Sequence, residues 1–403
     1  MSDKRFQDEA RWMLPEGIDE VLPPAADRLE QLRRRILDCY RSWGYELILT
    51  PFVEFLESLL TGTGKDLEAQ TFKLMDPLSG RMMGIRADIT PQAARIEAHR
   101  LDRDVPVRLC YLGTVLRASA GELGGSRAPL QVGAELYGHA GIESDLEVLE
   151  LMLETLHITG VQTVHVDLGH VAIYRRLARH AGLEGRCEAA LFDALQRKAR
   201  PEIEGILAEA RLADRESGWL AALAELNGGP EVLGEARERL AGAPDGVLDA
   251  LGQLETVARE MGRRHPHLPL HFDLAELRGY NYQTGLVFAA FTPGYGRELA
   301  RGGRYDHIGR VFGRARPATG FSADLKALLL LAEGEEFGNP GGILAPAEND
   351  SALEATIASL RAAGERVIRA LPGLDNHARQ LGCDRRLVRS ADGWKVEPVA
   401  EGE

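Results

Sequence analysis

One group of residues has the types and spacing to hold a small charged ligand. It is the glycine-rich run from Arg117 to Arg127, which is followed by Gln131 and Glu135. Two strand-like segments flank this run, so it has the composition of a hairpin whose arginines can close over an anion. The structural alternative is an exposed hairpin with solvated arginines, and taken alone the segment favours that alternative.

Two further segments place polar side chains next to predicted strands. In RADITP, Asp88 and Thr90 stand at positions i and i+2 at a strand end, so their side chains point the same way. The structural alternative for this pair is a helix cap before Pro91. In ELRGYNYQTG, Arg278 and two tyrosines, the second of them Tyr282, precede a strand. Taken alone, this segment could be a turn with packed aromatic rings.

Motifs for metal and cofactor chemistry are missing from the sequence. His265, His267 and His271 lie in a proline-rich connection without a carboxylate or cysteine at ligand spacing, so a surface loop is the preferred interpretation. The glycine-rich run 296–306 is not GxGxxG, and neither a GxSxG elbow nor a Walker loop occurs. The four cysteines contain no CxxC pair. We therefore predict no metal ion and no cofactor.

Length and composition describe a globular protein with more than one domain. The chain has 403 residues, of which 44% are hydrophobic and 27% charged, and this length favours about two to three domains. A net charge of -13 disfavours a large nucleic-acid surface, because phosphate binding depends on clustered cations. No run reaches the ~18 apolar residues of a membrane span, and the charged start lacks an apolar export segment. We expect a cytoplasmic protein with free thiols and no membrane partner.

The elements that must position these residues alternate between helices and short strands. Helical spacing covers 25–43, and Gly44 ends it before a strand at 45–49. Further strands are predicted at 82–85, 107–115, 130–137, 163–168 and 285–291, with helices at 91–99 and 144–157. Several strands are joined by loops too short for a crossover helix, which favours an antiparallel sheet flanked by helices. The predicted fold class is therefore α+β.

Two parts of the chain differ from this core. Residues 171–262 are rich in Ala, Leu, Glu and Arg with helical periodicity, which predicts a helical insertion. A glycine-containing linker at 333–342 then leads into a segment with a pattern of its own. There we predict a small α/β domain with strands at 343–345 and 366–370, a helix at 352–363 and a hairpin at 386–398.

In chain order, these segments resemble class II aminoacyl-tRNA synthetases, and in particular the catalytic core of histidyl-tRNA synthetase. The match runs over residues 10–330, from LPEGIDEVLPPAA through LRGYNYQTGLVF to GGRYDHIGRVFG. LRGYNYQTGLVF is similar to the histidine-specific segment of that enzyme. The resemblance implies a mainly antiparallel class II sheet with a helical insertion at 171–262. We accordingly predict a core domain over 1–332 and a small C-terminal α/β domain over 343–403.

The resemblance assigns a histidine pocket to residues on the amino-acid side of the site. Asp88 stands in place of the family's glutamate for the substrate ammonium, and Thr90 and Gln131 match its hydrogen-bonding partners. Glu135 matches the carboxylate that reads the imidazole. A zwitterion with an imidazole needs an anion, a cation and a ring-nitrogen acceptor in one pocket, which agrees with these types.

The same segment comparison covers the far end of the histidine pocket. Arg278 matches the arginine beside the substrate carboxylate, and Tyr282 matches a pocket tyrosine. Gln283 replaces a second tyrosine of the family. The resemblance thus predicts histidine binding by Asp88, Thr90, Gln131, Glu135, Arg278 and Tyr282.

The nucleotide side of the synthetase site departs from the family pattern. Arg117 and Arg127 are kept and are candidates for binding an anion, but a family glutamate is Ser119 and the adenine-stacking phenylalanine is Pro129. In the last motif the family's arginine is Ala327. Losing that cation removes stabilisation of charge on transferred phosphates, so we predict no adenylation and no catalytic residues.

RADITPQAAR, the altered motifs and the short tail are similar to a synthetase paralogue, the regulatory subunit of ATP phosphoribosyltransferase. That resemblance implies a non-catalytic chain that activates a separate short catalytic subunit in the first step of histidine biosynthesis. It also implies feedback inhibition with L-histidine as effector, a hetero-octamer of four regulatory and four catalytic chains, and no tRNA partner. The alternatives are a working histidyl-tRNA synthetase or another synthetase-like ligase, against which Ser119 and Ala327 count.

Overall fold

The computed structural model describes residues 12–61, 65–101, 103–119, 125–277, 282–332, 341–372, 377–391 and 393–400. The chain divides into two compact units, Met1–Glu333 and Gly334–Glu403. The first unit holds a nine-stranded and a three-stranded sheet, and the second holds a four-stranded sheet.

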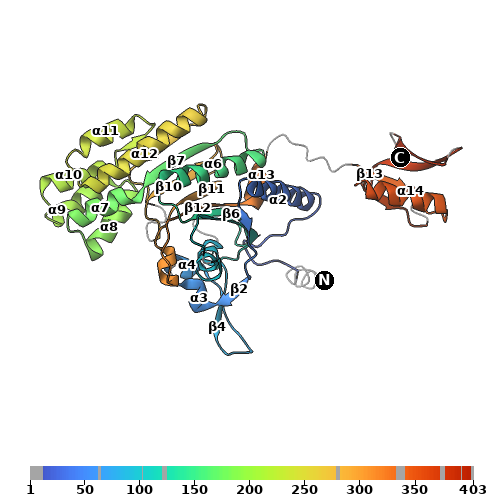
Figure 1. The fold of residues 1–403 in the computed structure, drawn as a ribbon, viewed down its shortest axis with the longest axis horizontal. Helices are drawn as coiled ribbons and strands as arrows, with labels where there is room; N and C mark the ends of the chain where they lie inside the picture. Colours follow the sequence, from blue (N-terminus) through green and yellow to red (C-terminus); the bar gives the residue numbers. More distant parts are fainter. Residues whose placement is uncertain are drawn as a thin grey trace, which may run out of the picture. The chain divides into compact units, whose positions relative to one another are not determined.

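A nine-stranded sheet forms the centre of the first unit (Figure 1). Its strands lie in the order β1-β5-β6-β12-β11-β10-β7-β9-β8. Their bounds are β1 Glu46–Leu47, β5 Val107–Thr114, β6 Leu130–Tyr137, β7 His165–His170, β8 Asn227–Gly228, β9 Leu270–Asp273, β10 Leu286–Phe291, β11 Ala300–Arg304 and β12 Ala318–Asp324. Pairing is antiparallel except between β1 and β5 and between β7 and β9. The predicted, mainly antiparallel sheet is confirmed.

Helices cover one face of this sheet (Figure 1). They include α2 Ala25–Ser42, α6 Ile142–Ile158 and α13 Leu325–Leu331. In α2, Leu32, Ile36 and Tyr40 recur every four residues and are fully buried, as expected for an amphipathic helix. Tyr40 packs edge to face on Phe321 of β12, with 6.2 Å between ring centroids. Because Phe321 alternates with its neighbours along β12, Gly320 and Ser322 project from the opposite face.

The first unit also contains a small sheet with the order β2-β4-β3, and a short helix follows it. The elements of this region are β2 Val53–Phe55, α3 Leu56–Leu60, α4 Lys65–Gln70, β3 Lys73–Met75, β4 Met82–Ile85, α5 Thr90–Ile96 and a π-helical turn Glu97–Leu101. The guanidinium of Arg86 joins the small sheet to β5, because it donates to the backbone oxygens of Thr50 and Thr114 at 2.9 Å each. This contact fixes the start of the segment that carries Asp88.

The predicted helical insertion is present as six helices. They are α7 Val171–His180, α8 Gly185–Gln196, α9 Arg200–Glu209, α10 Asp214–Ala222, α11 Val232–Arg239 and α12 Asp245–Arg264. Arg175 of α7 donates to the backbone oxygen of Gln283 at 3.0 Å. The insertion therefore supports the segment that leads into β10.

In its described residues, the second unit has a four-stranded sheet with the order β14-β13-β15-β16 and one helix. Its elements are β13 Gly342–Ala345, α14 Ser351–Ala362, β14 Val367–Arg369, β15 Cys383–Ser390 and β16 Gly393–Pro398. Ile343, Leu353, Ile357 and Leu387 form the core between sheet and helix. The small α/β fold predicted for the tail is confirmed. Among the described residues of the whole chain, no helix is long and apolar enough to cross a membrane.

Candidate functional site

The candidate site lies on one face of the three adjacent strands β6, β12 and β11. Gln131 and Glu135 are four residues apart in β6, so both side chains project from this face. The register pairs Glu135 with Gly320, and Gly320 with Gly303. A Cβ at Gly320 would overlap the Glu135 carboxylate. Because these two glycines have no side chains, polar side chains of the site can lie directly above them.

Glu135 is the most buried charged group of the site, with 1% of its surface exposed. Tyr111 of β5 donates a hydrogen bond to Oε1 at 2.9 Å, and Tyr305, which follows β11, donates to Oε2. Burial raises the pKa of Glu135 to about 8, although the tyrosine hydrogen bonds act in the opposite direction. A carboxylate has about four acceptor positions and a protonated carboxyl keeps part of them, so Glu135 can accept from a ligand in either state.

Asp88, Thr90 and Gln131 come together at the ammonium end of the predicted pocket. Nε2 of Gln131 donates to Oδ1 of Asp88 at 2.9 Å, and Oε1 of Gln131 accepts from the backbone N of Ile89 at 2.9 Å. Oδ1 of Asp88 also accepts from the backbone N of Thr90 at 2.9 Å, ahead of α5. Within the described ranges, Oδ2 of Asp88 accepts no hydrogen bond. That oxygen is available to a ligand cation.

A hydrogen-bond chain connects the two ends of this pocket. The hydroxyls of Thr90 and Tyr111 are 3.0 Å apart, and Tyr111 in turn donates to Glu135. The structure therefore brings together four of the six residues predicted to bind histidine, namely Asp88, Thr90, Gln131 and Glu135.

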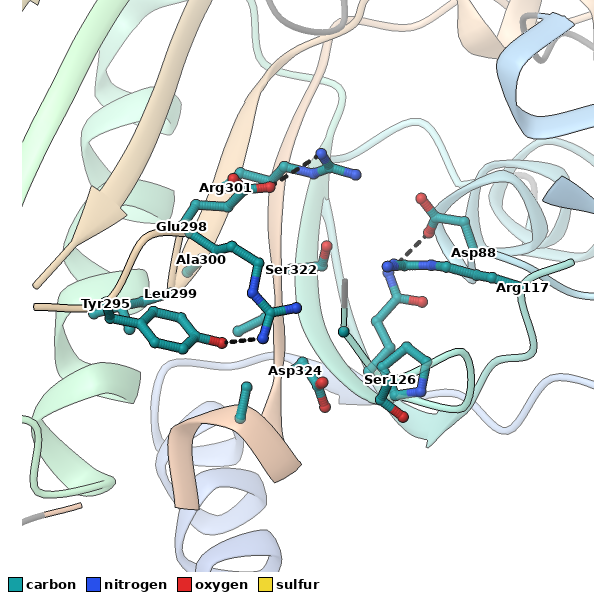
Figure 2. A pocket seen from close by; sticks show the side chains of 16 residues that line it. Asp88, Arg117, Ser126, Tyr295, Glu298, Leu299, Ala300, Arg301, Ser322 and Asp324 are labelled. Carbon is teal, nitrogen blue, oxygen red and sulfur yellow. Dashed lines mark hydrogen bonds and ion pairs between the residues drawn. The ribbon is translucent and has the colours of Figure 1, made fainter. Parts of the chain in front are cut away.

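A pocket of about 400 Å³ opens beside Asp88 (Figure 2). Its charged lining consists of three arginines and three carboxylates, which are Arg117, Arg297, Arg301, Asp88, Glu298 and Asp324. Figure 2 shows Arg301 paired with Glu298, at 3.2 Å, and Arg297 hydrogen bonded to Tyr295, at 2.8 Å. A lining with both signs of charge suits a zwitterion such as an amino acid.

Arg117 differs from the other arginines of this pocket. Its Nε is buried without a hydrogen-bond partner, and its guanidinium makes no ion pair with any described residue. Burial lowers the pKa of Arg117, while the nearby Asp88 carboxylate acts in the opposite direction. The unpaired Nε–H of this partly buried guanidinium lacks an acceptor, so an anionic group of a ligand would be stabilised beside Arg117.

Arg127, the second candidate for binding an anion, does not line the pocket. Its guanidinium donates to the backbone oxygens of Arg117 and Glu16 at 3.0 Å each, and it lies 5.3 Å from the centre of the Phe72 ring. Arg127 therefore holds the N-terminal segment against the hairpin.

The two remaining predicted residues lie in the segment before β10. Tyr282 is 39% exposed, and its ring centroid is 6.5 Å from that of Tyr305, so it lies at the edge of the Glu135 end. Arg278 lies outside the described residues.

The region where a synthetase would bind nucleotide is lined by the start of α13. The carboxylate of Asp324 accepts from the backbone N of Lys326 at 3.1 Å and so caps this helix. The Lys326 ammonium pairs with Asp19 at 3.3 Å, and Ala327 lines the pocket. The described α13 therefore supplies no positive side chain to the pocket.

Sequence reasoning missed three groups of the site, Tyr111, Tyr305 and Arg301. Arg301 and Tyr305 lie in the glycine-rich run 296–306, which the sequence motifs tested only as a dinucleotide fingerprint. The role of Tyr111 depends on its register opposite Gly133, which no local pattern shows. Among the described residues, no group of three or more His, Cys, Asp or Glu side chains could hold a metal ion.

Comparison with known proteins gives two family matches that together span most of the chain. Residues 17–328 match the family model described as histidyl-tRNA synthetase. Residues 340–397 match the model of the ATP phosphoribosyltransferase subunit HisZ C-terminal domain. The first match agrees with the class II fold that the motifs predicted.

Individual relatives agree with both models. An ATP phosphoribosyltransferase regulatory subunit from Alkalilimnicola ehrlichii is 56% identical over 99% of this chain and 100% of its own length. A solved ATP phosphoribosyltransferase regulatory subunit/histidyl-tRNA synthetase from Bacillus halodurans is 27% identical, with a TM-score of 0.79 over 92% of this chain and 96% of that chain. A chain of the HisG:HisZ ATP phosphoribosyltransferase complex from Thermotoga maritima has the same fold, with 19% identity and a TM-score of 0.57 over 73% of this chain and 96% of that chain.

Proposed function

Because the chain belongs to the family of ATP phosphoribosyltransferase regulatory subunits, we propose that its synthetase-like pocket is the sensor for L-histidine. The family role is regulatory and non-catalytic, in the first step of histidine biosynthesis. Histidine bound in this pocket inhibits a catalytic site on another chain. Feedback of this kind requires that histidine bind an inactive arrangement of the complex more tightly than an active one.

The observation that carries this proposal is the hydrogen-bonded chain that connects Asp88, through Thr90 and Tyr111, to Glu135. Oδ2 of Asp88 accepts no hydrogen bond from the described residues. Glu135 is buried on the same face of β6 as Gln131, which contacts Asp88. In the proposal, the ligand ammonium binds Asp88 and Gln131, the imidazole binds Glu135, and Tyr282 covers the ring. Arg117 receives the ligand carboxylate, together with Arg278.

The alternative function, a working histidyl-tRNA synthetase, lacks support on the nucleotide side. Ala327 occupies the position of the synthetase's arginine, and the neighbouring Lys326 is paired with Asp19. Transferring an activated phosphate requires donors placed where charge develops, and the described α13 provides none. The pocket geometry thus favours ligand binding without adenylation.

We also propose a composition for the complex that this chain forms with its catalytic subunit. The Thermotoga maritima relative is named as a HisG:HisZ complex, and we assign this chain a short catalytic subunit as partner, in a cytoplasmic hetero-octamer of four plus four. This chain activates that partner and makes it sensitive to histidine. In this assignment residues 1–332 form the sensing core, and 343–403 form a separate small domain.

Calorimetric titration of the isolated chain with L-histidine tests the sensor assignment. We expect binding to be weakened by about 10-fold or more in Asp88→Asn and in Glu135→Gln, since hydrogen bonds to charged groups contribute about 1.5–3 kcal/mol. Asp38→Asn is the control, because Asp38 is an exposed residue of α2 that pairs with Arg41. Unchanged affinity in both pocket variants would place the histidine site elsewhere.

A further inference from the structure

The N-terminal segment 16–19 is attached to two walls of the pocket through Asp19. Oδ1 of Asp19 accepts from the Ser126 hydroxyl at 2.7 Å. Its Oδ2 pairs with the Lys326 ammonium at 3.3 Å, and the same ammonium donates to the backbone oxygen of Asp19 at 3.2 Å. Ser126 lines the pocket, and so does Ala327, the residue after Lys326. Asp19 therefore joins the hairpin that ends at Arg127 to the start of α13.

Arg127 holds the preceding part of this segment independently of Asp19. Its backbone N donates to the oxygen of Gly17 at 2.6 Å, and its guanidinium donates to the oxygen of Glu16 at 3.0 Å. Gly17 has a φ of 72°, and a Cβ there would be 3.0 Å from the Arg127 side chain. The segment is thus held at Glu16 and Gly17 whether or not Asp19 makes its contacts, so those contacts determine only how the residues after Gly17 are held.

The contacts of Asp19 are weak enough for a ligand to change them. The Asp19 side chain is 50% exposed, and an exposed ion pair contributes little to stability. A ligand shifts an equilibrium between two arrangements by as much as its affinities for them differ. Binding of a small molecule can therefore break the contacts of a single exposed carboxylate without unfolding the surrounding structure.

The Ser126 hydroxyl has one proton to donate and faces two acceptors. It donates that proton to Asp19, while its oxygen accepts from the backbone N of Ala128 at 3.1 Å. Figure 2 shows Ser126 and Arg117 on the same side of the pocket, opposite Tyr295. The proposed function puts the carboxylate of histidine beside Arg117. That carboxylate and the carboxylate of Asp19 are then alternative acceptors for the same hydroxyl.

We propose that Asp19, Ser126 and Lys326 form a latch that histidine opens, because the ligand carboxylate takes the Ser126 hydrogen bond from Asp19 and so releases the N-terminal segment after Gly17 from the hairpin. This inference rests on the proposed function, because it needs histidine in the pocket. Histidine binding and closure of the latch then oppose each other, and such coupling is reciprocal. A substitution that opens the latch must therefore tighten histidine binding, whereas loss of a purely structural contact would weaken binding or leave it unchanged.

Calorimetric titration of the full chain with L-histidine tests this relationship. Asp19→Ala should tighten histidine binding about 5-fold, which corresponds to one competing hydrogen bond. Lys326→Met, which frees Asp19 from α13, should act in the same direction. Because one substitution removes a negative charge and the other a positive charge, a shared direction excludes a general electrostatic effect.

Two further variants identify the hydroxyl as the shared group. In Ser126→Ala the hydroxyl is missing from both arrangements, so adding Asp19→Ala to this background should leave the histidine affinity nearly unchanged. Glu20→Ala is the matched control, because Glu20 is a neighbouring exposed residue that makes no ion pair with any described residue. Its histidine affinity should equal that of the parent.

Histamine, which lacks the carboxylate of histidine, is the second probe. Asp19→Ala should bind it no more tightly than the parent chain does, because histamine offers Ser126 no carboxylate as an acceptor. Unchanged or weakened histidine binding in Asp19→Ala, or an equal gain for histamine, would overturn the latch. A parent chain that binds no histidine would instead overturn the proposed function and this inference with it.

Discussion

Tyr305 donates a hydrogen bond to Glu135 across an intervening strand. Glu135 belongs to β6 and Tyr305 follows β11, and β12 lies between them. The contact is possible because Gly320, which pairs with Glu135 in the β6–β12 ladder, has no side chain at that point. One glycine thus determines whether the buried carboxylate can be held from both sides.

Gly320→Ala should therefore disrupt the pocket. The added methyl group would overlap Oε2 of Glu135, and the rigid ladder around Gly320 allows little movement. We expect a loss of about 1–3 kcal/mol in the free energy of unfolding, as for overpacked cores, together with weakened histidine binding. Denaturant unfolding and calorimetric titration measure the two effects.

Gly252→Ala is the matched control for that substitution. Gly252 lies inside α12, and a Cβ there would meet nothing within 4 Å. Replacement should stabilise the chain by about 0.5–1 kcal/mol, because glycine lowers helix stability. If Gly320→Ala proved as harmless as this control, a position without a side chain at residue 320 would not be needed for the site.

The sequence predicted the polar residues of this site better than it predicted the strands that position some of them. Gln131 and Glu135 lie in an apolar run with clear strand character, so their shared face was readable. β11 and β12 contain Gly302, Gly303 and Gly320, and glycine has low strand propensity, so no strand was predicted there. The glycines that leave space in the pocket are therefore also the reason why β11 and β12 were not predicted.

The sequence patterns also could not predict contacts between strands that are far apart in the chain. Tyr111 and Tyr305 hold Glu135 only because β5, β6, β12 and β11 pair in one particular register. For Arg127 a local pattern did suggest a role, because its position in a glycine-rich hairpin predicted that it binds an anion. Its donors instead go to backbone oxygens of Arg117 and Glu16.

The isolated chain should not exchange pyrophosphate into ATP in the presence of histidine. Ala327 supplies no cation to the pocket, and Lys326 is held by Asp19. Without a donor where phosphate charge develops, the adenylation step loses stabilisation of its transition state. A radiolabelled exchange assay, with a histidyl-tRNA synthetase as positive control, measures this directly. Robust exchange by the chain itself would restore the ligase alternative.

Stability should depend on pH through Glu135. Its pKa is about 8 in the folded chain, whereas an unfolded glutamate has a pKa of about 4.3. The stabilising contribution of the protonated group is therefore complete below about pH 4.3 and is lost as the pH rises to about 8. Glu135→Gln cannot ionise, so the Tm of this variant minus that of the parent should increase with pH up to about 8 and then level off.

Thermal unfolding in a series of buffers from about pH 5 to about pH 9 measures this difference. A Tm difference that stayed constant over the whole range would show that Glu135 keeps an ordinary pKa. That result would contradict the burial of the Glu135 side chain between two tyrosine hydroxyls.

We propose above that this pocket senses histidine for a catalytic site on another chain. Reconstitution of the transferase from the short catalytic subunit and an Asp88→Ala, Glu135→Ala chain tests it most directly, with transferase activity measured over a range of histidine concentrations. We expect the variant to activate the catalytic subunit still, while inhibition should require about 10-fold or more histidine. Inhibition as strong as with the unmodified chain would contradict it, because the signal would then arise outside this pocket.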